Sequence, residues 1–271
     1  MNNLAAPEYL PIRTFGPVDG QPVVLLHGFL ADSRQWLPLI RLADALTQQP
    51  VRWILPDLPG HGRAAGQFPP QPGWLPLTDL LQRSVQPHLR EPALWGGYSM
   101  GGRVAAVLAA EQRLELAGLW LESAHPPLAD AAARLRREED EIRARRLESE
   151  GVRPFVHAWQ ELPLFASQKL LPRAIRDRQR RLRLDQDAEG LAQSLRWYGT
   201  GTMPTTLAIA VKTRILAGAW DASLLSRLPE WSRWVGHLHT TVIADAGHAV
   251  HLERPSETAA HLAATIDAIS S

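Results

Sequence analysis

The sequence predicts an α/β protein with a mostly parallel, doubly wound sheet and an inserted helical cap. Short apolar runs bounded by glycine, proline or aspartate alternate along the chain with longer segments of helical periodicity. This alternation is typical of a doubly wound sheet. Most of the runs lack apolar/polar alternation, which is expected for parallel strands covered by helices on both faces. In such a sheet, ligands bind at the carboxyl ends of the strands.

The predicted elements follow one another in a regular order. The apolar runs predicted as buried strands are residues 22–26, 51–55, 93–96, 116–121, 214–218 and 240–244, and residues 9–15 are predicted as an edge strand. Helical spacing is found between them, for example over residues 37–46, 102–110 and 257–269. The chain therefore reads as one large domain rather than two small ones.

The alternation stops between residues 126 and 200. This stretch is helical in pattern, rich in arginine, and contains no convincing strand. Its pairs Glu139/Arg143 and Glu141/Arg145 place the acid four residues ahead of the base, which favours ion pairs on a solvated helix face. We therefore predict a core formed by residues 1–125 and 201–271, with residues 126–200 inserted as a helical cap.

The composition argues against several classes of function. The 271 residues include 29 basic and 28 acidic side chains, for a net charge of +1, so no global field favours nucleic acid or an anionic membrane. The chain has no cysteine, which removes disulfides and thiol catalysis. Residues 1–20 do not resemble a secretion signal, and no run approaches the roughly 20 apolar residues of a membrane span. We expect a cytoplasmic monomer or homodimer.

The strongest functional signal is the motif Gly-Tyr-Ser-Met-Gly at residues 97–101. It follows the predicted strand at residues 93–96 and precedes a predicted helix. In this context, a G-x-S-x-G motif holds its serine on a strained turn with the hydroxyl exposed at a helix amino terminus. The alternative is an ordinary glycine-rich turn. We interpret Ser99 as a nucleophile or base.

A serine hydroxyl needs a neighbouring imidazole to take its proton. His248 follows the last predicted strand, and Asp221 follows the strand before it, which gives the chain order Ser, acid, His. Asp221 would fix the imidazole tautomer and stabilise the imidazolium. His251 is predicted to be structural or to line the rim, and Asp245 to cap the end of a strand.

The sequence His-Gly-Phe at residues 27–29 follows the first buried strand. The main-chain N–H groups of Phe29 and Met100 are predicted to form an oxyanion hole, which stabilises charge that develops only during the reaction. His27 is interpreted as a structural histidine. Asp57 and His61 lie in a turn without a third ligand at metal-site spacing, so we expect no metal and no cofactor.

Together these motifs resemble the α/β-hydrolase superfamily over nearly the whole chain. Three further features are most similar to the MenH family, the 2-succinyl-6-hydroxy-2,4-cyclohexadiene-1-carboxylate synthases of menaquinone biosynthesis. They are Arg103 after the serine motif, the run at residues 123–128 with Arg134 following, and Trp159 with its neighbours.

The resemblance implies a reaction other than ester hydrolysis. Enzymes of the MenH family eliminate pyruvate from a polycarboxylate precursor, with the triad acting as a base, and carboxylates are bound well by guanidinium groups. A third cap arginine is also implied, near Arg181 and Arg183. The residues implied as substrate contacts are Tyr98, Arg103, Arg134, Trp159 and Arg183.

Three hypotheses follow for the function. The favoured one is a cofactor-free carbon–oxygen lyase that eliminates pyruvate from 2-succinyl-5-enolpyruvyl-6-hydroxy-3-cyclohexene-1-carboxylate, a small-molecule polycarboxylate. The alternative is a serine carboxylesterase or thioesterase that forms an acyl-enzyme on Ser99 with a small acyl substrate. The third is a non-catalytic binding module that has retained the fold.

Overall fold

The computed structural model describes residues 7–269, so residues 1–6 and 270–271 of the predicted core lie outside it. In this part of the chain, seven strands form one sheet in the order β1-β3-β2-β4-β5-β6-β7. Only β1 runs antiparallel to its neighbour. The predicted doubly wound, mostly parallel sheet is therefore confirmed. The strands are β1 Ile12–Phe15, β2 Gln21–Leu26, β3 Val51–Pro56, β4 Ala93–Tyr98, β5 Leu116–Glu122, β6 Thr213–Gly218 and β7 Leu238–Ile243.

The central strands are buried along most of their length. All six residues of β4 and the last five of β2 are buried, because helices cover both faces of the sheet. The run at residues 240–244 was predicted as a buried strand, but it falls in the edge strand β7, where His239, Thr240 and Val242 are exposed. Its position at the edge leaves one side of the strand without a neighbour, which the local pattern does not show.

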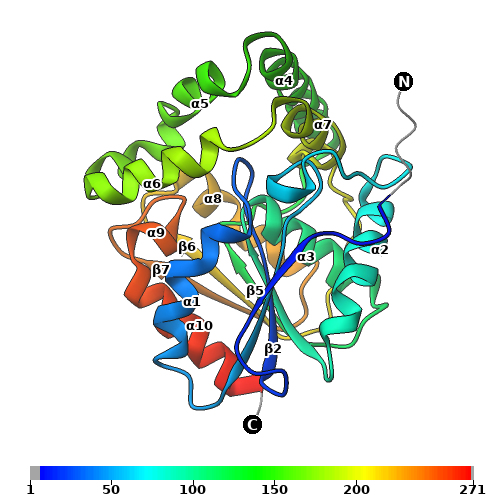
Figure 1. Ribbon diagram of the computed structural model, residues 1–271, viewed down its shortest axis with the longest axis vertical. Coiled ribbons are helices and arrows are strands. Elements are labelled where there is room, and N and C mark those ends of the chain that lie inside the picture. Colours follow the sequence, from blue (N-terminus) through cyan, green and yellow to red (C-terminus); the bar gives the residue numbers. More distant parts are fainter. Residues whose placement is uncertain (1–6, 270–271) are drawn as a thin grey trace.

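Helices pack on both faces of the sheet (Figure 1). α1 and α10 lie together on one face, and α2 and α3 pack on the other. A short helix, α9, follows β7. The helices outside the cap are α1 Leu37–Asp44, α2 Trp74–Val85, α3 Met100–Glu111, α8 Ala222–Arg227, α9 Val250–Glu253 and α10 Pro255–Ile269.

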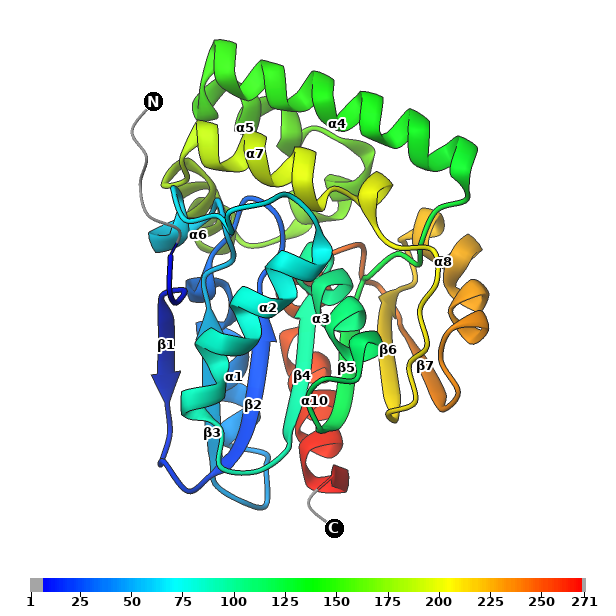
Figure 2. The ribbon, with the colours of Figure 1, turned by 90° about the vertical axis from the view of Figure 1, so that its right-hand side faces the viewer.

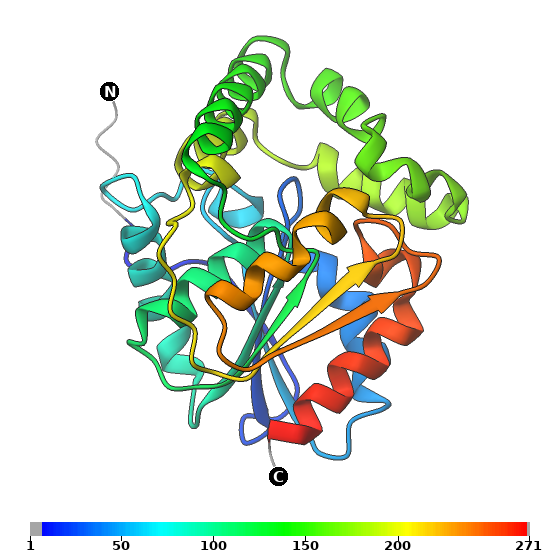
Figure 3. The same ribbon diagram turned by 180° about the vertical axis from the view of Figure 1, so that it is seen from behind.

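Four helices between β5 and β6 lie above the carboxyl ends of the parallel strands (Figure 2). The view from behind shows the same arrangement, with this layer covering the strand ends (Figure 3). We call these helices the cap, and propose that it extends over residues 126–200. They are α4 Asp130–Glu150, α5 Val152–Gln160, α6 Arg173–Leu184 and α7 Ala188–Tyr198.

The cap has an apolar cluster of its own, to which the loop after β2 contributes Leu30 and Phe29. Leu30, from the loop after β2, packs among cap side chains such as Leu147 and Leu191. The cap residue Gln186 accepts a hydrogen bond from the Gly62 N–H at 2.9 Å and donates one to Asp32 at 3.2 Å. The cap is thus joined to the loops at the carboxyl edge of the sheet.

Within residues 7–269, no helix is both long enough and apolar enough to cross a bilayer.

Candidate active site

Ser99 occupies the sharp turn between β4 and α3. Its backbone has φ 51° and ψ −107°, a strained conformation for a residue with a side chain. The turn requires close backbone contacts: a Cβ on Gly97 would overlap Gly101, and one on Gly101 would overlap the carbonyl of Leu26. The Ser99 N–H donates to the carbonyl of Glu122 at 2.8 Å. The small residues of the motif therefore allow the serine to project from the end of the strand.

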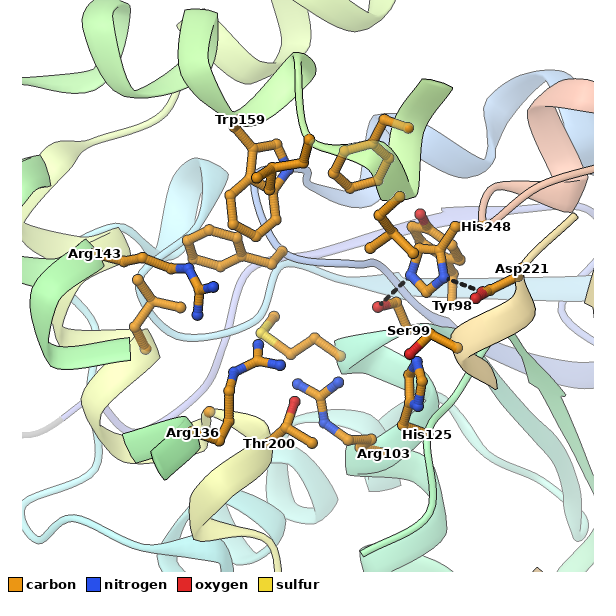
Figure 4. Close-up of a pocket in the computed structure, with 18 of the residues that line it drawn as sticks. Tyr98, Ser99, Arg103, His125, Arg136, Arg143, Trp159, Thr200, Asp221 and His248 are labelled. Atoms are coloured by element: carbon orange, nitrogen blue, oxygen red, sulfur yellow. Dashed lines mark hydrogen bonds and ion pairs between the residues drawn. The ribbon is translucent and has the colours of Figure 1, made fainter. Parts of the chain in front are cut away.

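The structure brings Ser99, His248 and Asp221 together. The Ser99 Oγ lies 3.0 Å from Nε2 of His248, and Nδ1 of His248 lies 2.6 Å from Oδ2 of Asp221 (Figure 4). The carboxylate can only accept, so Nδ1 carries the proton and Nε2 is left to accept from the serine hydroxyl. This geometry allows the imidazole to act as the base for Ser99.

Asp221 is held as an anion. Burial by itself would raise its pKa, but the hydrogen bond and charge of His248 and the Leu224 N–H, which donates to Oδ1 at 3.0 Å, hold the pKa below its usual value. Its two oxygens are thus both used. The charged carboxylate fixes the tautomer and orientation of His248.

Two main-chain N–H groups belong to residues that line the cavity containing Ser99. The N–H groups of Phe29 and Met100 make no hydrogen bond within residues 7–269, and both residues line the cavity that contains Ser99. The preceding His27 accepts a hydrogen bond at Nε2 from the Leu58 N–H at 2.9 Å, which braces the loop carrying Phe29. Unused N–H groups beside a nucleophile are suited to binding an oxyanion.

A cavity of about 600 Å³ lies between the core and the cap, with Ser99 and His248 at its wall. One side is aromatic: the ring of Trp159 lies 5.3 Å from that of Phe29 and 5.7 Å from that of Phe165. Tyr98 lines the cavity as well. Tyr98 and Trp159 thus line the same cavity as Ser99, and the cavity has room for a small organic substrate.

Arg103 carries the charge nearest to Ser99 along the chain, one helical turn after it. Its side chain is buried, lines the cavity and has an Nε without a partner. Burial, reinforced by the charge of Arg136, lowers the pKa of Arg103 to about 9, and Asp140 opposes this shift. No acidic side chain within residues 7–269 forms an ion pair with Arg103. A buried cation without a partner is costly, so this position favours an anionic ligand.

Two cap arginines line the same cavity, but Arg134 does not. Arg136 and Arg143 lie on the cavity side of α4 and share Asp140, at 2.9 and 2.8 Å. Figure 4 shows their guanidinium groups pointing into the cavity with that of Arg103. Arg134 is exposed, because it lies about 200° around the helix from Arg136. Arg136, rather than the predicted Arg134, therefore lines the cavity that contains Ser99.

Arg183 lines a second cavity of about 450 Å³. Its guanidinium lies 5.4 Å from the ring centroid of Phe165 and donates to Oε1 of Gln168 at 3.1 Å. Phe165 lines both cavities, so its ring stands between Arg183 and the space beside Ser99. Arg181 is exposed. The structure therefore does not bring either arginine into contact with the cavity at Ser99.

Two other polar residues near the triad have separate partners. His251 is buried and its Nδ1 lies 2.7 Å from Oε1 of Glu122. Asp245 is exposed at φ 52° and forms an ion pair with Arg254 at 2.9 Å. Neither residue takes the place of His248 or Asp221 in the hydrogen-bond chain to Ser99.

Sequence reasoning missed Arg136 and Arg143 as cavity residues. Arg143 was assigned to a solvated pair with Glu139, and this pair does form, at 3.2 Å. Helix α4 is charge-dense and buries few side chains, so hydrophobic periodicity could not show which face points inward. His125 also lines the cavity, which its place in the run at residues 123–128 did not indicate.

A family model described as "Alpha/beta hydrolase family" matches residues 23–261. The chain belongs to the α/β-hydrolase family. The prediction of an enzyme with this fold is therefore confirmed. A 2-succinyl-6-hydroxy-2,4-cyclohexadiene-1-carboxylate synthase of Klebsiella pneumoniae is 31% identical to this α/β-hydrolase over 90% of the chain and 95% of the relative.

Solved structures agree with this assignment. MenH from S. aureus has a TM-score of 0.87 and 32% identity, covering 96% of this chain and 99% of that one. A thermophilic esterase from Thermogutta terrifontis, with malate bound, has a TM-score of 0.79 and 26% identity, covering 96% of this chain and 94% of the esterase. The resemblance of this α/β-hydrolase to the MenH family is therefore confirmed.

Proposed function

We propose that this α/β-hydrolase eliminates pyruvate from 2-succinyl-5-enolpyruvyl-6-hydroxy-3-cyclohexene-1-carboxylate. The observation that carries the proposal is Arg103, a buried guanidinium without an acidic partner in the cavity that contains Ser99. Arg136 and Arg143 add two cations, which share Asp140, and Arg143 also pairs with the exposed Glu139. Such a site suits a substrate with several carboxylates. Relatives named as synthases of the elimination product support the proposal.

The chemistry follows from the substrate and the product. The hydrogen on C2 is acidic because the succinyl ketone is attached there. Removing it lets the C2 electrons form C2=C3, the C3=C4 pair move to C4=C5, and the C5–O bond break. The ring becomes the 2,4-diene, and the enolpyruvyl group leaves as pyruvate. The reaction needs a base at C2 and stabilisation of negative charge on oxygen.

The triad would supply the base. Ser99 Oγ takes the C2 proton as its own proton passes to Nε2 of His248, which lies 3.0 Å away. Asp221 stabilises the imidazolium that forms. The N–H groups of Phe29 and Met100 donate to the ketone oxygen as it gains charge. No covalent bond to Ser99 is required.

The other side chains of the cavity would bind the substrate. Arg103, Arg136 and Arg143 pair with its carboxylates, and Tyr98 and Trp159 contact the ring. Arg183 lies against Phe165 and lines the second cavity. It would contact the substrate if one of the substrate's carboxylates extended into that cavity.

The test is direct measurement of pyruvate. The precursor is generated enzymatically, and pyruvate release is followed through lactate dehydrogenase and NADH, with Ser99→Ala as the matched control. We expect catalysed release by the wild type and a loss of roughly 10⁴-fold in the variant. Equal rates for the two proteins would remove the proposal.

Ester hydrolysis is the second candidate, and it is supported by the esterase neighbour with malate bound, itself a dicarboxylate. Here Ser99 would attack an acyl carbon and form an acyl-enzyme. A burst of product from an activated ester, with an adduct on Ser99 seen by mass spectrometry, would favour this candidate. Pyruvate release without any adduct would favour the lyase.

A further inference from the structure

The segment that carries His125 is held rigidly at the edge of the active-site cavity. It begins directly after β5 with Ser123, which has φ 50°. The indole of Trp231 donates to a carbonyl at 3.0 Å and the guanidinium of Arg227 to two more, at 3.3 and 2.6 Å, all within residues 124–127. Two of these residues are prolines. A strained backbone held by this many contacts is typical of a functional position.

The ring of His125 faces the cavity without a protein partner. It makes no hydrogen bond within residues 7–269, and it lines the cavity with Ser99 and Arg103. Its centroid lies 6.3 Å from that of His248. Figure 4 shows the ring on the same side of the cavity as the Arg103 guanidinium. Its nitrogens are therefore open to a bound substrate.

The surroundings keep this imidazole neutral. Burial is the largest cause of a lowered pKa for His125, and the charge of His248 lowers the pKa further. Asp221 raises the pKa, whereas Arg103 and Arg227 lower it. The pKa of His125 is about 3 as a result. A neutral imidazole has one N–H donor and one acceptor. It can donate a hydrogen bond to an anion without giving up its proton, as neutral histidines do when they stabilise enolates.

The elimination needs such a donor away from the oxyanion hole. The N–H groups of Phe29 and Met100 serve the ketone oxygen at C2, where the proton is removed. The bond that breaks is at C5, across the ring, and its electron pair stays on the enolpyruvyl oxygen. A fixed donor at that oxygen would stabilise charge that develops only in the transition state.

We propose that His125 is a further catalytic residue, whose neutral ring N–H donates a hydrogen bond to the enolpyruvyl oxygen as the C5–O bond breaks. This inference rests on the proposed function. The C2 proton passes to Ser99 and the serine proton to His248, while His125 keeps its own. The departing enolate of pyruvate then takes a proton on its methylene carbon, from His248 or water, so that protons and electrons balance.

The test compares a variant without a donor with one that retains a donor. His125→Leu is expected to lower kcat roughly 10²-fold with little change in KM, and His125→Gln to remain within about tenfold of the wild type. His125→Met is a second donor-free variant if the leucine protein does not fold. A wild-type kcat in a folded donor-free variant would overturn the role of His125.

Deuterium exchange separates the two halves of the reaction. In D₂O, a variant that removes the C2 proton normally but expels the leaving group slowly returns deuterium to C2. Substrate recovered from the reaction with His125→Leu should therefore carry deuterium at C2. Substrate recovered from the reaction with the wild type should not. A slow variant that leaves the substrate unlabelled would also overturn the proposal. If the wild type itself releases no pyruvate, the proposed function fails instead.

The charge of the ring can be checked without turnover. The ¹⁵N shifts of the His125 imidazole, assigned by comparison with His125→Gln, should stay those of a neutral ring from pH 8 to pH 5. A protonated ring at pH 6 would contradict a neutral donor.

Discussion

The two sides of the active-site cavity differ in how their polar groups are paired. On the core side, a chain of hydrogen bonds runs from Ser99 through His248 and Asp221 to the Leu224 N–H. On the cap side, Asp140 accepts from two guanidinium groups. The core side therefore presents a complete hydrogen-bond chain, whereas on the cap side Arg136 and Arg143 share Asp140 and Arg143 also pairs with Glu139.

This difference separates two tasks. Hydrogen bonds that are complete before substrate arrives hold reacting groups in place. Cations that lack full partners gain most of their compensation from a bound anion. Substitutions in the core should therefore lower kcat, and those of the cap arginines should mainly raise KM for the polycarboxylate.

The largest effect is expected from Asp221→Asn. The amide cannot hold His248 in the tautomer that leaves Nε2 free to accept from Ser99, so kcat for pyruvate release should fall by roughly 10⁴-fold. KM should change little. Steady-state kinetics would check this, and a fall confined to KM would contradict the assigned role.

The next effect is expected from Arg103→Gln, which keeps hydrogen-bond donors but removes the buried charge. We expect kcat/KM to fall roughly 10²-fold, in line with the loss of a hydrogen bond to a charged group. Activity on a neutral activated ester should fall less. Equal losses on the two substrates would indicate a structural role for Arg103.

A smaller effect should distinguish the two faces of α4. Arg136→Gln removes one cavity arginine and leaves Asp140 paired with Arg143. KM for the polycarboxylate should therefore rise by about tenfold. The matched control is Arg134→Gln, which changes an exposed residue of the same helix and should leave KM unchanged. The reverse result would restore Arg134 as the substrate contact.

The smallest effect concerns stability and pH. Burial, reinforced by the charge of His27, lowers the pKa of His61 to about 3, whereas an unfolded histidine titrates near 6.5. The unfolded state therefore binds the proton first, and stability is lost as pH falls below about 6.5, by up to about 1.4 kcal/mol per pH unit. Urea unfolding of His61→Gln at pH 7.5 and 5.5 should show a smaller loss than the wild type, by about 1 kcal/mol.

The cap offers the control for this measurement. His157 is exposed on α5, so His157→Gln should follow the wild type at both pH values. An identical pH dependence in all three proteins would show that His61 is not kept neutral by burial.

Local chemistry is what made much of the fold predictable. The strand at residues 93–96 was predictable because it is apolar throughout, and the turn after it because only glycine fits at positions 97 and 101. Helix α2 was not singled out, because prolines at positions 69, 70, 72 and 76 obscure its start. Its stability comes from packing on α3 and the sheet, which a local pattern does not show.

The triad residues were predictable from the sequence, whereas the cap residues of the cavity were not. Ser99, Asp221 and His248 each follow a predicted strand, so parallel topology alone places them at one edge. The inward face of α4 could not be predicted, because α4 buries only four residues, one of which is Asp140. On such a helix the choice between Arg134 and Arg136 depends on tertiary contacts.

Arg103 and Ser99 are joined by the first turn of α3, where the Arg103 N–H donates to the Ser99 carbonyl at 3.1 Å. The spacing between Ser99 and Arg103 is therefore set by helix geometry and is independent of the cap. A chimera that exchanged the whole cap for that of another α/β-hydrolase would keep this spacing. Under the proposed function, such an exchange would alter the substrate range while Arg103 kept one carboxylate at a fixed distance from the reacting carbon.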